Sequence, residues 1–539
     1  MCVPSWLSDL FTYSIIHISF KDKNMKTQGI YTLLQVALIL LLAACTREEF
    51  PAIQNKVQQL TISITDGGYA SVVDNKTTRA VENVYTTAFT EGDACGLYVV
   101  RGTQTLYSNV KLIAERDADT GDLVWKSENT TPLMGGLSDE HYYLYYPYQA
   151  DMSGKTATLT GSALTDTEFF APLVSAWQPQ DDQSTHAAYT ASDLMTAEGI
   201  ATPDANNTLN LSFPMTHQMA LVVIEMPKTV YKFTSTNYPD YTTDTEAEFT
   251  GAVQPLRVTN DTYRYLVNSQ ATSSPTIEGS YDDGSKEFTV SPSNLAAGHY
   301  KKYKVNGLTE LTKSYAIQPG DFLLANGNLV PKEISLTEEQ KASVTAIVFY
   351  VGHHENDASD YSATRIGQKK CHGYAVALQD ATTTNIYCMW GVYDKELGLY
   401  ISGTNNVGNP DIDWNGYSNT QKIVNAAGGE QNLNKDTEAG YPATWYAVVD
   451  YESKHPAPAK SSGWFLPSIG QMYRLYTQRK VLEKISVYDS LHGQYWSSSE
   501  EYGAPNYEAL YVSFTYTIWT IDGGEKGSND CYVRSILAF

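Results

Sequence analysis

The sequence predicts a mainly β protein of several domains, most of them sandwiches or barrels, with an α+β part at its C-terminal end. Short apolar runs recur along the chain and are separated by turn-forming residues, which is typical of antiparallel β architectures. Tyrosine is abundant at 40 residues, and its side chain suits the half-buried surface of a pleated sheet. No long stretch of helical periodicity precedes Glu338. The 539 residues are enough for two to four domains, and 42% hydrophobic against 18% charged residues indicates a folded chain.

The N-terminal apolar run has the features of an export signal. It covers residues 30–44, follows Met25 and Lys26, and is shorter than the ~20 residues that span a membrane. A basic start, a short apolar middle and small residues at the end are typical of a secretory signal peptide. The final "LAAC" resembles a bacterial lipobox, which implies cleavage before Cys45 and lipid on its sulfur; an ordinary signal peptide with a chance cysteine is the alternative. Translation then starts at Met25, and residues 1–24 are an upstream extension.

The strand candidates follow the signal at short intervals. The first, "VQQLTISITDGG", alternates apolar and polar residues and turns at its final glycine pair. Asp283-Gly284 and Asn326-Gly327 are dipeptides that tight hairpins prefer, so a hairpin is expected at each. The other strand candidates before the main boundary are residues 92–100, 106–116, 122–128, 140–148, 208–215 and 219–227.

Two of these segments carry bulky side chains on both faces. Residues 219–226 are apolar on both faces for most of their length, which predicts a central strand of a sandwich. His217 stands just before this strand and is expected to be a hydrogen-bonded core residue rather than a metal ligand. Residues 142–148, "YYLYYPY", are predicted to pack in the core and at an interface rather than to form a platform on which sugars stack.

The pattern changes near Lys332 to Glu338, where the main domain boundary is expected. Either Ser335 or Thr337 is suited to cap a short helix with glutamates in its first turn. A buried strand, "TAIVFYVG", then precedes two convincing helices, over 418–428 and 468–485. The second helix has one apolar stripe, made of Ile469, Met472, Leu475 and Tyr476.

Composition and motifs argue against nucleic-acid binding and against catalysis. Lysine and arginine total 37 against 60 acidic residues, and the resulting net charge of −23 is repelled by phosphate backbones. The sequence has no nucleophile elbow, no Walker loop and no zinc-protease helix motif. No catalytic residue, no cofactor and no metal ligand is therefore assigned, and the chain is not expected to be an enzyme.

Two polar loops have some features of a cation site. "GHHENDASD" gathers two histidines and three carboxylates, a set able to hold a divalent ion, although a solvated loop is the favoured interpretation. "DIDWNG", from Asp411 to Gly416, matches the first half of an EF-hand loop, but Lys422 occupies the position that needs a bidentate glutamate.

The folded part of the chain keeps four cysteines once Cys2 and Cys45 are set aside, namely Cys95, Cys371, Cys388 and Cys531. Three of them lie in the C-terminal third, where an oxidising compartment would allow one pair to be bridged. Four cysteines allow three complete pairings, so the pairing stays open. Their spacing is unlike a CxxC knuckle, so structural zinc is not expected.

Four segments of the N-terminal half match a known family in wording, order and spacing. They are "TTRAVENVYTTAFTEGDACGLYVV", "YYLYYPY", "ASDLMTAEG" and "LSFPMTHQMALVVIEMP", and they resemble the fimbrillin family of pilus subunits from Bacteroidales. Near the other end, "GWFLPSIGQMYRL", "YWSSSE" and "CYVRSILAF" resemble a C-type-lectin-like module of surface proteins from the same bacteria. The resemblances imply two tandem transthyretin-like β-sandwich domains followed by an α+β C-type-lectin-like domain. Calcium-dependent sugar binding is not implied, because the Trp-Asn-Asp motif is missing.

These features divide the chain into six expected parts. They are residues 1–24, the upstream extension; 25–44, the lipoprotein signal peptide; 45–79, a leader whose first strand is removed or exchanged on maturation; 80–228, the N-terminal fimbrillin β domain; 229–334, the second fimbrillin β domain; and 335–539, the C-type-lectin-like domain.

The resemblance implies assembly by strand exchange between subunits. A trypsin-like protease cuts after an arginine in the leader, which frees the first strand and opens a groove for an extended segment of a neighbouring subunit. Arg79, in "KTTRAV", is the candidate cut site, so Ala80 becomes the new N-terminus; the surrounding stretch is polar, as suits proteolysis. Arg47 is the nearest competitor but lies next to the lipid anchor.

The expected C-terminal end favours a subunit at a fibre tip. The last strand, "CYVRSILAF", is expected to pair inside its own domain, so the chain accepts a strand but does not easily donate one. The predicted function is therefore a tip pilin of a cell-surface fimbria with an adhesive C-terminal domain, held at the outer membrane by lipid before processing. The expected partners are other fimbrial subunits and a host or bacterial surface glycan or protein. The alternatives are a lipid-held fimbrial anchor and a surface enzyme or glycan-binding lipoprotein.

Five residues of the C-terminal domain are assigned structural roles. Trp464 and Pro467 are expected to fix the entry to the second helix, and Trp496 is expected to pack against that helix. Glu500 is expected to pair with Arg534 as part of the scaffold, because a buried Arg–carboxylate pair is costly to break on one side.

Overall fold

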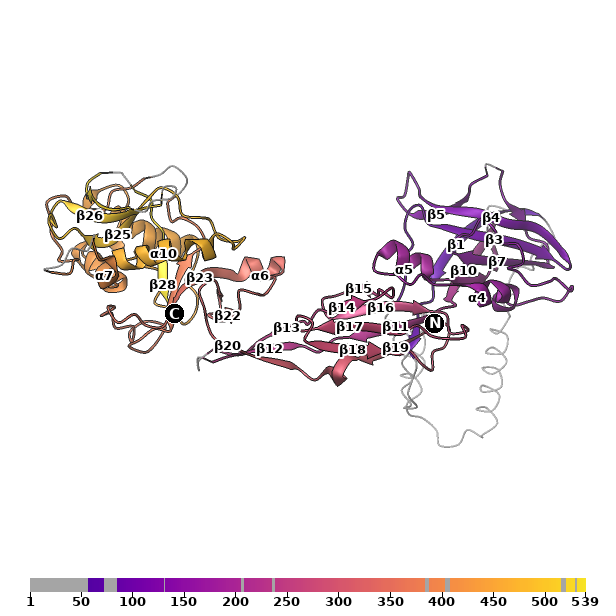
Figure 1. Cartoon of the computed structure of the whole chain (residues 1–539). Helices are drawn as coiled ribbons and strands as arrows, with labels where there is room; N and C mark the ends of the chain where they lie inside the picture. Colours follow the sequence, from indigo (N-terminus) through magenta and orange to yellow (C-terminus); the bar gives the residue numbers. More distant parts are fainter. Residues whose placement is uncertain are drawn as a thin grey trace, which may run out of the picture.

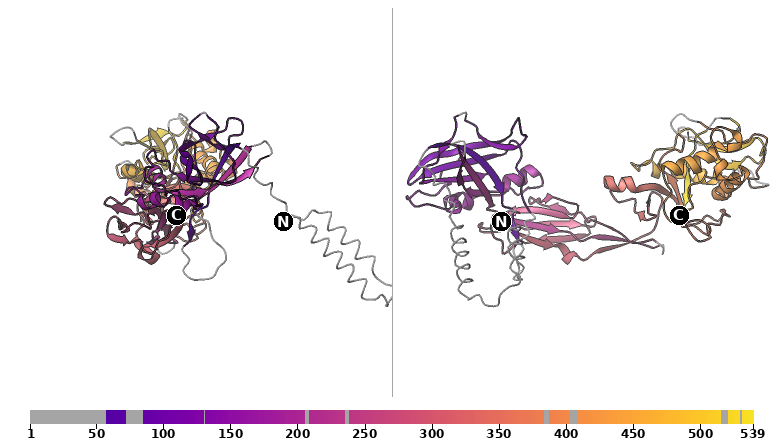
Figure 2. Two further views of the ribbon diagram at one scale, coloured as in Figure 1. Left: turned by 90° about the vertical axis from the view of Figure 1, so that its right-hand side faces the viewer. Right: turned by 180° about the vertical axis from the view of Figure 1, so that it is seen from behind.

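The computed structural model of the chain describes residues 57–71, 85–129, 131–204, 208–234, 238–382, 387–402, 408–514, 520–528 and 531–539. These residues form three bodies in a row, which we call the N-terminal, middle and C-terminal bodies (Figure 1). The view from behind shows the same row, with the middle body joining the other two (Figure 2). Strands dominate the first two bodies, and helices are concentrated in the third, so the chain is mainly β, as predicted.

The N-terminal body is built on one nine-stranded sheet. Its strands, in spatial order, are β5 (Leu123–Ser127), β4 (Gln104–Arg116), β3 (Ala94–Arg101), β7 (Glu140–Tyr146), β8 (Met195–Glu198), β10 (Thr208–His217), β1 (Gln58–Asp66) and β6 (Met134–Gly135), with β9 (Ile200–Pro203) paired to β10. Leu60 of β1 and Trp125 of β5 lie near opposite ends of this order and share one apolar cluster. The sheet therefore curls around its core, as a sandwich or barrel does.

Three short helices cover the other face of this sheet. They are α3 (Asp166–Phe169), α4 (Ala171–Ala176) and α5 (His186–Ser192). Phe169 and Leu173 from these helices share an apolar cluster with Tyr143 of β7 and with Leu221 from the middle body. The helices thus lie at the junction of two bodies, and the tyrosines of "YYLYYPY" pack in the core and at this interface, as predicted.

The middle body contains a five-stranded sheet and two three-stranded sheets. The first has the order β15 (Leu256–Arg257), β16 (Thr262–Val267), β11 (Ala220–Glu225), β19 (His299–Lys304) and β2 (Ala70–Ser71). The others are β14 (Glu248–Thr250), β17 (Ile277–Tyr281) and β18 (Lys286–Val290), and β13 (Tyr241–Thr243), β12 (Thr229–Phe233) and β20 (Leu311–Tyr315); a 3-10 turn, η1 (Val305–Leu308), follows β19.

Strand β11 is central, as its apolar pattern predicts. It pairs antiparallel with β16 on one side and parallel with β19 on the other. Leu221 and Val223 belong to the cluster shared with the N-terminal body, whereas Val222 and Ile224 belong to a second cluster inside the middle body. The expected N-terminal domain, 80–228, therefore needs a correction, because β11 already belongs to the middle sheet.

The C-terminal body has a five-stranded sheet, a three-stranded sheet and most of the helices. The larger sheet has the order β22 (Leu329–Val330), β21 (Phe322–Leu324), β23 (Val344–Val351), β24 (Gly373–Ala377) and β28 (Ile536–Ala538), and the smaller one consists of β25 (Gln494–Glu500), β26 (Glu508–Ser513) and β27 (Thr520–Glu525). The helical segments are α6 (Glu338–Ser343), η2 (Pro410–Ile412), α7 (Gly416–Ala426), η3 (Glu430–Asn432), η4 (Glu438–Gly440), α8 (Pro442–Trp445), η5 (Tyr446–Asp450), α9 (Tyr451–Lys454) and α10 (Ile469–Leu482).

The expected boundary at Lys332 to Glu338 also needs a correction. The predicted hairpin around Asn326-Gly327 exists as β21 and β22, but β21 pairs with β23 and so belongs to the C-terminal sheet. The predicted hairpin around Asp283-Gly284 also exists, as β17 and β18 in the middle body. Helix α6 is capped by Thr337, whose side chain accepts a hydrogen bond from the Gln340 amide.

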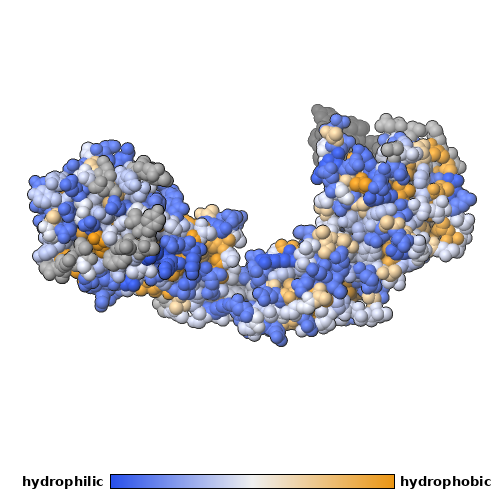
Figure 3. All heavy atoms as spheres, turned by 45° about the horizontal axis from the view of Figure 1, so that its top comes forward, coloured by the Kyte–Doolittle hydropathy of each residue, from blue (hydrophilic) through white to orange (hydrophobic). Residues whose placement is uncertain are grey.

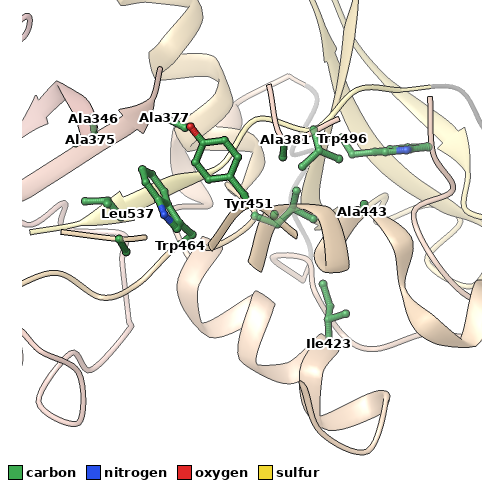
Figure 4. Close-up of a cluster of buried hydrophobic side chains, with 14 of the residues drawn as sticks. Ala346, Ala375, Ala377, Ala381, Ile423, Ala443, Tyr451, Trp464, Trp496 and Leu537 are labelled. Carbon is green, nitrogen blue, oxygen red and sulfur yellow. The ribbon is translucent and has the colours of Figure 1, made fainter. Parts of the chain in front are cut away.

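Two apolar clusters fill the C-terminal body, one on each face of its larger sheet. Leu537 of β28 lies with Trp464, Tyr451 and Ala375 in the first cluster (Figure 4). The stripe of α10 packs in the second cluster with Ile536 and Ala538 of the same strand. The last strand is therefore enclosed by side chains on both of its faces.

The surface carries no single large apolar patch on the face shown in Figure 3, where hydrophilic residues surround small orange areas. Within the described part of the chain, no helix is both long enough and apolar enough to cross a membrane.

Truncating a side chain of β11 tests whether this strand joins the N-terminal body to the middle body. Leu221 is fully buried, so Leu221→Ala is expected to lower the free energy of unfolding by about 2–5 kcal/mol, measured by urea titration and circular dichroism. Val258 is 42% exposed, so Val258→Ala is the matched control and is expected to change it by about 0.5 kcal/mol or less. Equal effects from the two variants would contradict a central position for β11.

Candidate functional site

Strand β1, the only described strand of the expected leader besides the short β2, is built into the N-terminal sheet. It runs parallel to β10 from Gln59 opposite Thr208 to Asp66 opposite Met215, whereas on its other side it meets β6 only at two residues. Leu60 is buried in the core cluster, and Ile62 and Ile64 pack against that cluster. The alternation in the sequence thus places one face of β1 on the core and leaves the other exposed.

A buried ion cluster lies where β1 ends. His217, at the end of β10, has its Nε2 atom 2.9 Å from Asp66 Oδ1 and its Nδ1 atom 2.9 Å from Asp193 Oδ1. Tyr69 stacks on the imidazole with ring centroids 3.8 Å apart and donates a hydrogen bond to the Asp193 carboxylate. His217 is thus a core residue with polar partners, as predicted, and its partners are two carboxylates.

The charge of His217 follows from these contacts. Burial alone disfavours the imidazolium, but the two carboxylates favour it more strongly, and the pKa of His217 is raised to about 9. The pKa of Asp66 is lowered, because contacts with His217 and with backbone amides outweigh its burial. At neutral pH the cluster therefore contains an imidazolium held between two carboxylates.

The chain next crosses from the N-terminal to the middle body. Ala70 and Ser71 form β2, which pairs parallel with β19. Tyr69 forms an antiparallel bridge with Tyr85, so the two ends of the segment between them are held together. The expected processing site, Arg79 and Ala80, lies in that segment and outside the described residues, as does the lipidation candidate Cys45.

The carboxyl-terminal strand is paired on both edges. β28 lies antiparallel to β24, with Ala375 opposite Leu537, and on its other edge Ile536 exchanges two backbone hydrogen bonds with Phe465. The Phe539 carbonyl accepts a hydrogen bond from the His372 amide, and residues 531–539 are all buried. The pairing of this strand inside its own body agrees with the sequence-based prediction.

The entry to α10 is fixed by backbone and hydroxyl contacts. The Pro467 carbonyl accepts a hydrogen bond from the Ser498 amide, and Ser499 Oγ accepts one from the Ile469 amide. Trp464 and Trp496 lie together in one apolar cluster, whereas the stripe of α10 lies in the other. Strand β25 contacts the start of α10 through Ser498 and Ser499, and the packing of Trp496 against the helix stays a prediction.

The expected pair between Glu500 and Arg534 is also wrong. Glu500 pairs with Lys526, whose Nζ atom is 2.5 Å from Glu500 Oε1, and both side chains are fully buried. Arg534 instead donates from Nε to Asp380 Oδ1 at 2.7 Å. Glu500, at the end of β25, and Asp380, in the loop after β24, therefore pair with different cations, which the spacing along the chain does not reveal.

Both ion pairs are held by further contacts. Lys526 Nζ also donates to the carbonyls of Lys395 and Pro505, and the Glu500 carboxylate accepts from the amides of Leu397 and Leu399. Burial lowers the pKa of Lys526 more than Glu500 raises it. These contacts make the pair a clamp between residues 395–399 and residues 500–505.

Arg534 supports the wall of a surface pocket. It donates to the carbonyls of Ala377 and Asp489, and it holds the Asp380 carboxylate in place. The pocket has a volume of about 420 Å³, and its lining includes Gln379, Asp380, Thr382, His455, Asp489 and His492. Arg534 therefore acts as scaffold, although with a partner other than the expected one.

The two polar loops pack on each other instead of standing in solvent. The His354 ring stacks on Trp414 with centroids 3.9 Å apart, and Asp357 accepts hydrogen bonds from Tyr361 and Tyr374. The solvated interpretation of "GHHENDASD" is therefore wrong for its buried residues. In the part of the chain that the structure describes, no three His, Cys, Asp or Glu side chains are grouped so as to hold a metal ion.

Two of the four cysteines face each other across a β-bridge. The Cys388 amide donates to the Cys531 carbonyl, and both side chains are buried. Cys95 lies in the N-terminal core and Cys371 lies in the second cluster of the C-terminal body. All four are free cysteines in the structure, and the Cys388 thiol donates to the Cys531 carbonyl, so a disulfide in the C-terminal third stays a prediction with its pairing open.

Part of this chain is similar to a known protein family. The sequence profile described as fimbrillin-like matches residues 78–317. These residues of the chain are therefore similar to the fimbrillin family. The match covers the N-terminal and middle bodies from β3 to the loop that precedes β21; it leaves out β1 and β2 and stops short of the C-terminal body.

Similar proteins cover most of the length of this chain. It is 27% identical over 567 residues to a Bacteroides ovatus protein described as "Putative fimbrium tip subunit Fim1C", with 94% of this chain and 99% of the relative covered. A solved fimbrial protein from Bacteroides ovatus covers 90% of this chain and 100% of its own, at 24% identity and a TM-score of 0.41. A solved cell adhesion protein from Bacteroides uniformis, described as putative, covers 48% of this chain and 94% of its own, at 16% identity and a TM-score of 0.27.

The ion cluster of His217, Asp66 and Asp193 predicts a pH dependence of stability. Because the pKa of His217 rises from 6.5 to about 9 on folding, its contribution is complete below pH 6.5 and is lost as the pH rises through about 9. The full contribution is on the order of 3 kcal/mol. Urea titrations between pH 6 and pH 9.5 are expected to show this loss in the wild type and a flatter profile in His217→Gln; parallel profiles would contradict the assignment.

The clamp in the C-terminal body predicts which acid and base are coupled. Lys526→Met leaves the Glu500 carboxylate buried without a cation and is expected to lower the free energy of unfolding by about 3–5 kcal/mol. Lys454 is the control, because its side chain is half exposed where it pairs with Asp450, and Lys454→Met is expected to cost about 1 kcal/mol or less. A double-mutant cycle by urea titration and tryptophan fluorescence should couple Glu500 to Lys526; a larger coupling of Glu500 to Arg534 would overturn the assignment.

Proposed function

We propose that this fimbrial subunit occupies the tip of a cell-surface fimbria and carries an adhesive C-terminal domain. The observation that carries the proposal is the pairing of β28 on both edges, because a strand built into its own sheet is not available to a neighbouring subunit. The similarity to a protein described as a fimbrium tip subunit, over 94% of this chain, supports the same position.

The second part of the proposal is that β1 is the strand that leaves on maturation. It has one long neighbour, β10, and only a two-residue contact with β6. Its removal would expose the side of the core cluster that Leu60, Ile62 and Ile64 now cover. An exposed apolar groove beside the free edge of β10 is a strong template for an extended strand from another subunit.

The third part of the proposal concerns the domain boundaries and the N-terminal signal. We place the first boundary between β10 and β11 and the second before β21, since β11 belongs to the middle sheet and β21 to the C-terminal sheet. The C-terminal domain is proposed to be C-type-lectin-like. Residues 25–44 are proposed to be a lipoprotein signal peptide, so that Cys45 carries lipid and holds the precursor at the outer membrane until Arg79 is cut.

Processing at Arg79 is tested by the N-terminus of the surface protein. Wild-type chain shaved from fimbriated cells is expected to begin at Ala80 by mass spectrometry, and Arg79→Ala is expected to abolish that product. Arg47→Ala is the matched control and is expected to process normally. A lipidated Cys45 on the assembled protein would mean a held anchor instead of a released subunit.

The position along the fibre is tested separately with gold-labelled antibody against the C-terminal body. Label is expected at one end of each fibre and not along its length. A purified mixture of this chain with other subunits tests the opposite case. Polymers that elongate from this chain, with a segment of this chain inserted into the next subunit, would refute the tip assignment.

A further inference from the structure

The exposed tyrosines of the protein gather in its C-terminal body. The described residues include four tyrosines with more than a third of their surface exposed, and all four lie between Tyr387 and Tyr507. Tyrosines of the other two bodies are mostly buried in cores and junctions. Tyrosine is enriched at protein interfaces because its ring supplies a large contact area with a polar end, so this distribution marks a binding surface.

Three of these residues belong to one surface that two distant segments build. The rings of Tyr393 and Tyr507 lie 5.2 Å apart, and the rings of Tyr400 and Tyr502 lie 5.4 Å apart. The Lys395 amide donates to the Asn506 carbonyl between the two ring pairs. We call these four rings the tyrosine surface; the fourth exposed tyrosine, Tyr387, contacts Tyr532 instead.

The tyrosine surface rests on the buried clamp. Lys526 Nζ contacts Glu500 and the carbonyls of Lys395 and Pro505, so a single ammonium group ties the two tyrosine-bearing segments together. The same ammonium group lies 4.8 Å from the centre of the Trp390 ring. Rings held in place before binding lose little conformational entropy on contact, so a partner gains more affinity from them.

Carboxylates border the tyrosine surface. Glu396 accepts a hydrogen bond from Tyr400, and Glu438 accepts one from the Tyr393 amide. On β26 and β27, Glu508 lies opposite Glu525 in the sheet register, and the Glu501 amide donates to the Glu508 carbonyl. Burial and the nearby charges of Glu501, Asp522 and Glu525 raise the pKa of Glu508. Lys526 cannot neutralise this border, because its charge is already paired with Glu500.

We propose that the tyrosine surface is a docking site for a cationic segment of a partner protein, rich in arginine or lysine. The rings of Tyr393, Tyr507, Tyr400 and Tyr502 offer faces for cation–π contacts, and the bordering carboxylates offer charge-assisted hydrogen bonds to guanidinium or ammonium groups. A cation would also relieve the repulsion among Glu501, Glu508 and Glu525, which an uncharged sugar would not. The inference rests on the proposed adhesive role of the C-terminal domain and names the chemical class of its partner.

The test uses the full chain and a fluorescent nonapeptide of arginine, with a glycine-serine nonapeptide as the uncharged probe. Polarisation titrations at about 0.15 M salt are expected to show binding of the arginine peptide only, since screening at this ionic strength removes most long-range attraction. The double variant Tyr393→Ser/Tyr507→Ser is expected to weaken binding by about tenfold or more. The control Tyr387→Ser is expected to bind within about twofold of the wild type.

A second pair of variants separates this site from the overall negative charge of the chain. Glu501→Gln/Glu508→Gln/Glu525→Gln and the exposed set Glu287→Gln/Glu310→Gln/Glu339→Gln remove the same number of charges. The first set is expected to weaken binding by about tenfold and the second by about twofold or less. Equal losses from both sets, or no loss from the tyrosine variant, would overturn the proposal.

The remaining outcomes separate this inference from the tip assignment. If a neutral glycan binds and only the tyrosine variant abolishes that binding, the surface recognises sugar, and the cationic partner is refuted. If antibody labels fibre tips but the arginine peptide binds all variants alike, the tip assignment stands and this inference fails. If the peptide binds only through the tyrosine surface but antibody labels the whole fibre, this inference stands and the tip assignment fails.

Discussion

The imidazole of His217 contacts two carboxylates from different parts of the chain. This buried contact connects β1 to β10 and to the loop after helix α5, at the junction of the N-terminal and middle bodies. Asp66 stands at the end of β1, His217 at the end of β10, and Asp193 follows helix α5 at the junction. Either carboxylate would be costly to bury without a partner, and here the imidazolium of His217 lies between the two and contacts both. The register of β1 against β10 is therefore set by charge as well as by its apolar face.

If β1 is the strand that leaves on maturation, as proposed, this constraint would hold it firmly until then. The apolar contribution of β1 is small, since Leu60 is its only buried apolar side chain and Ile62 and Ile64 are only partly buried. The ion cluster and the bridge between Tyr69 and Tyr85 add contacts at its far end, beyond the sheet core. If the strand leaves after cleavage, His217 loses one of its two carboxylates, so the incoming strand must restore or replace that contact to match the stability of the precursor.

The sequence predicts the elements of this protein better than their contacts. Alternation and turn dipeptides locate β1, β11 and both hairpins, because strand periodicity and turn chemistry are local properties. Helices α3 to α5 are missed because four to seven residues are too few to show a helical repeat. The partners of Glu500 and Arg534 are misassigned because Lys526 and Asp380 lie in loops that only the tertiary fold brings together. The residues that matter most at the junction, Asp66 and Asp193, stand in ordinary turn and loop sequences.

The first and last described strands, β1 and β28, differ in what their removal would cost, and under the proposed strand exchange this difference would give assembly a direction. β28 buries Ile536, Leu537 and Ala538 completely, with side chains in both clusters and hydrogen-bonded neighbours on both edges. At about 1.5–3 kcal/mol for each large side chain, together with the edge bonds, its extraction would unfold the sheet around it. β1 has one full-length neighbour and a face that stays exposed, so it can be replaced by a strand of similar alternation without disturbing the rest of the curled sheet. Under the proposed strand exchange, such a subunit would receive a strand in place of β1 and keep β28 in its own sheet.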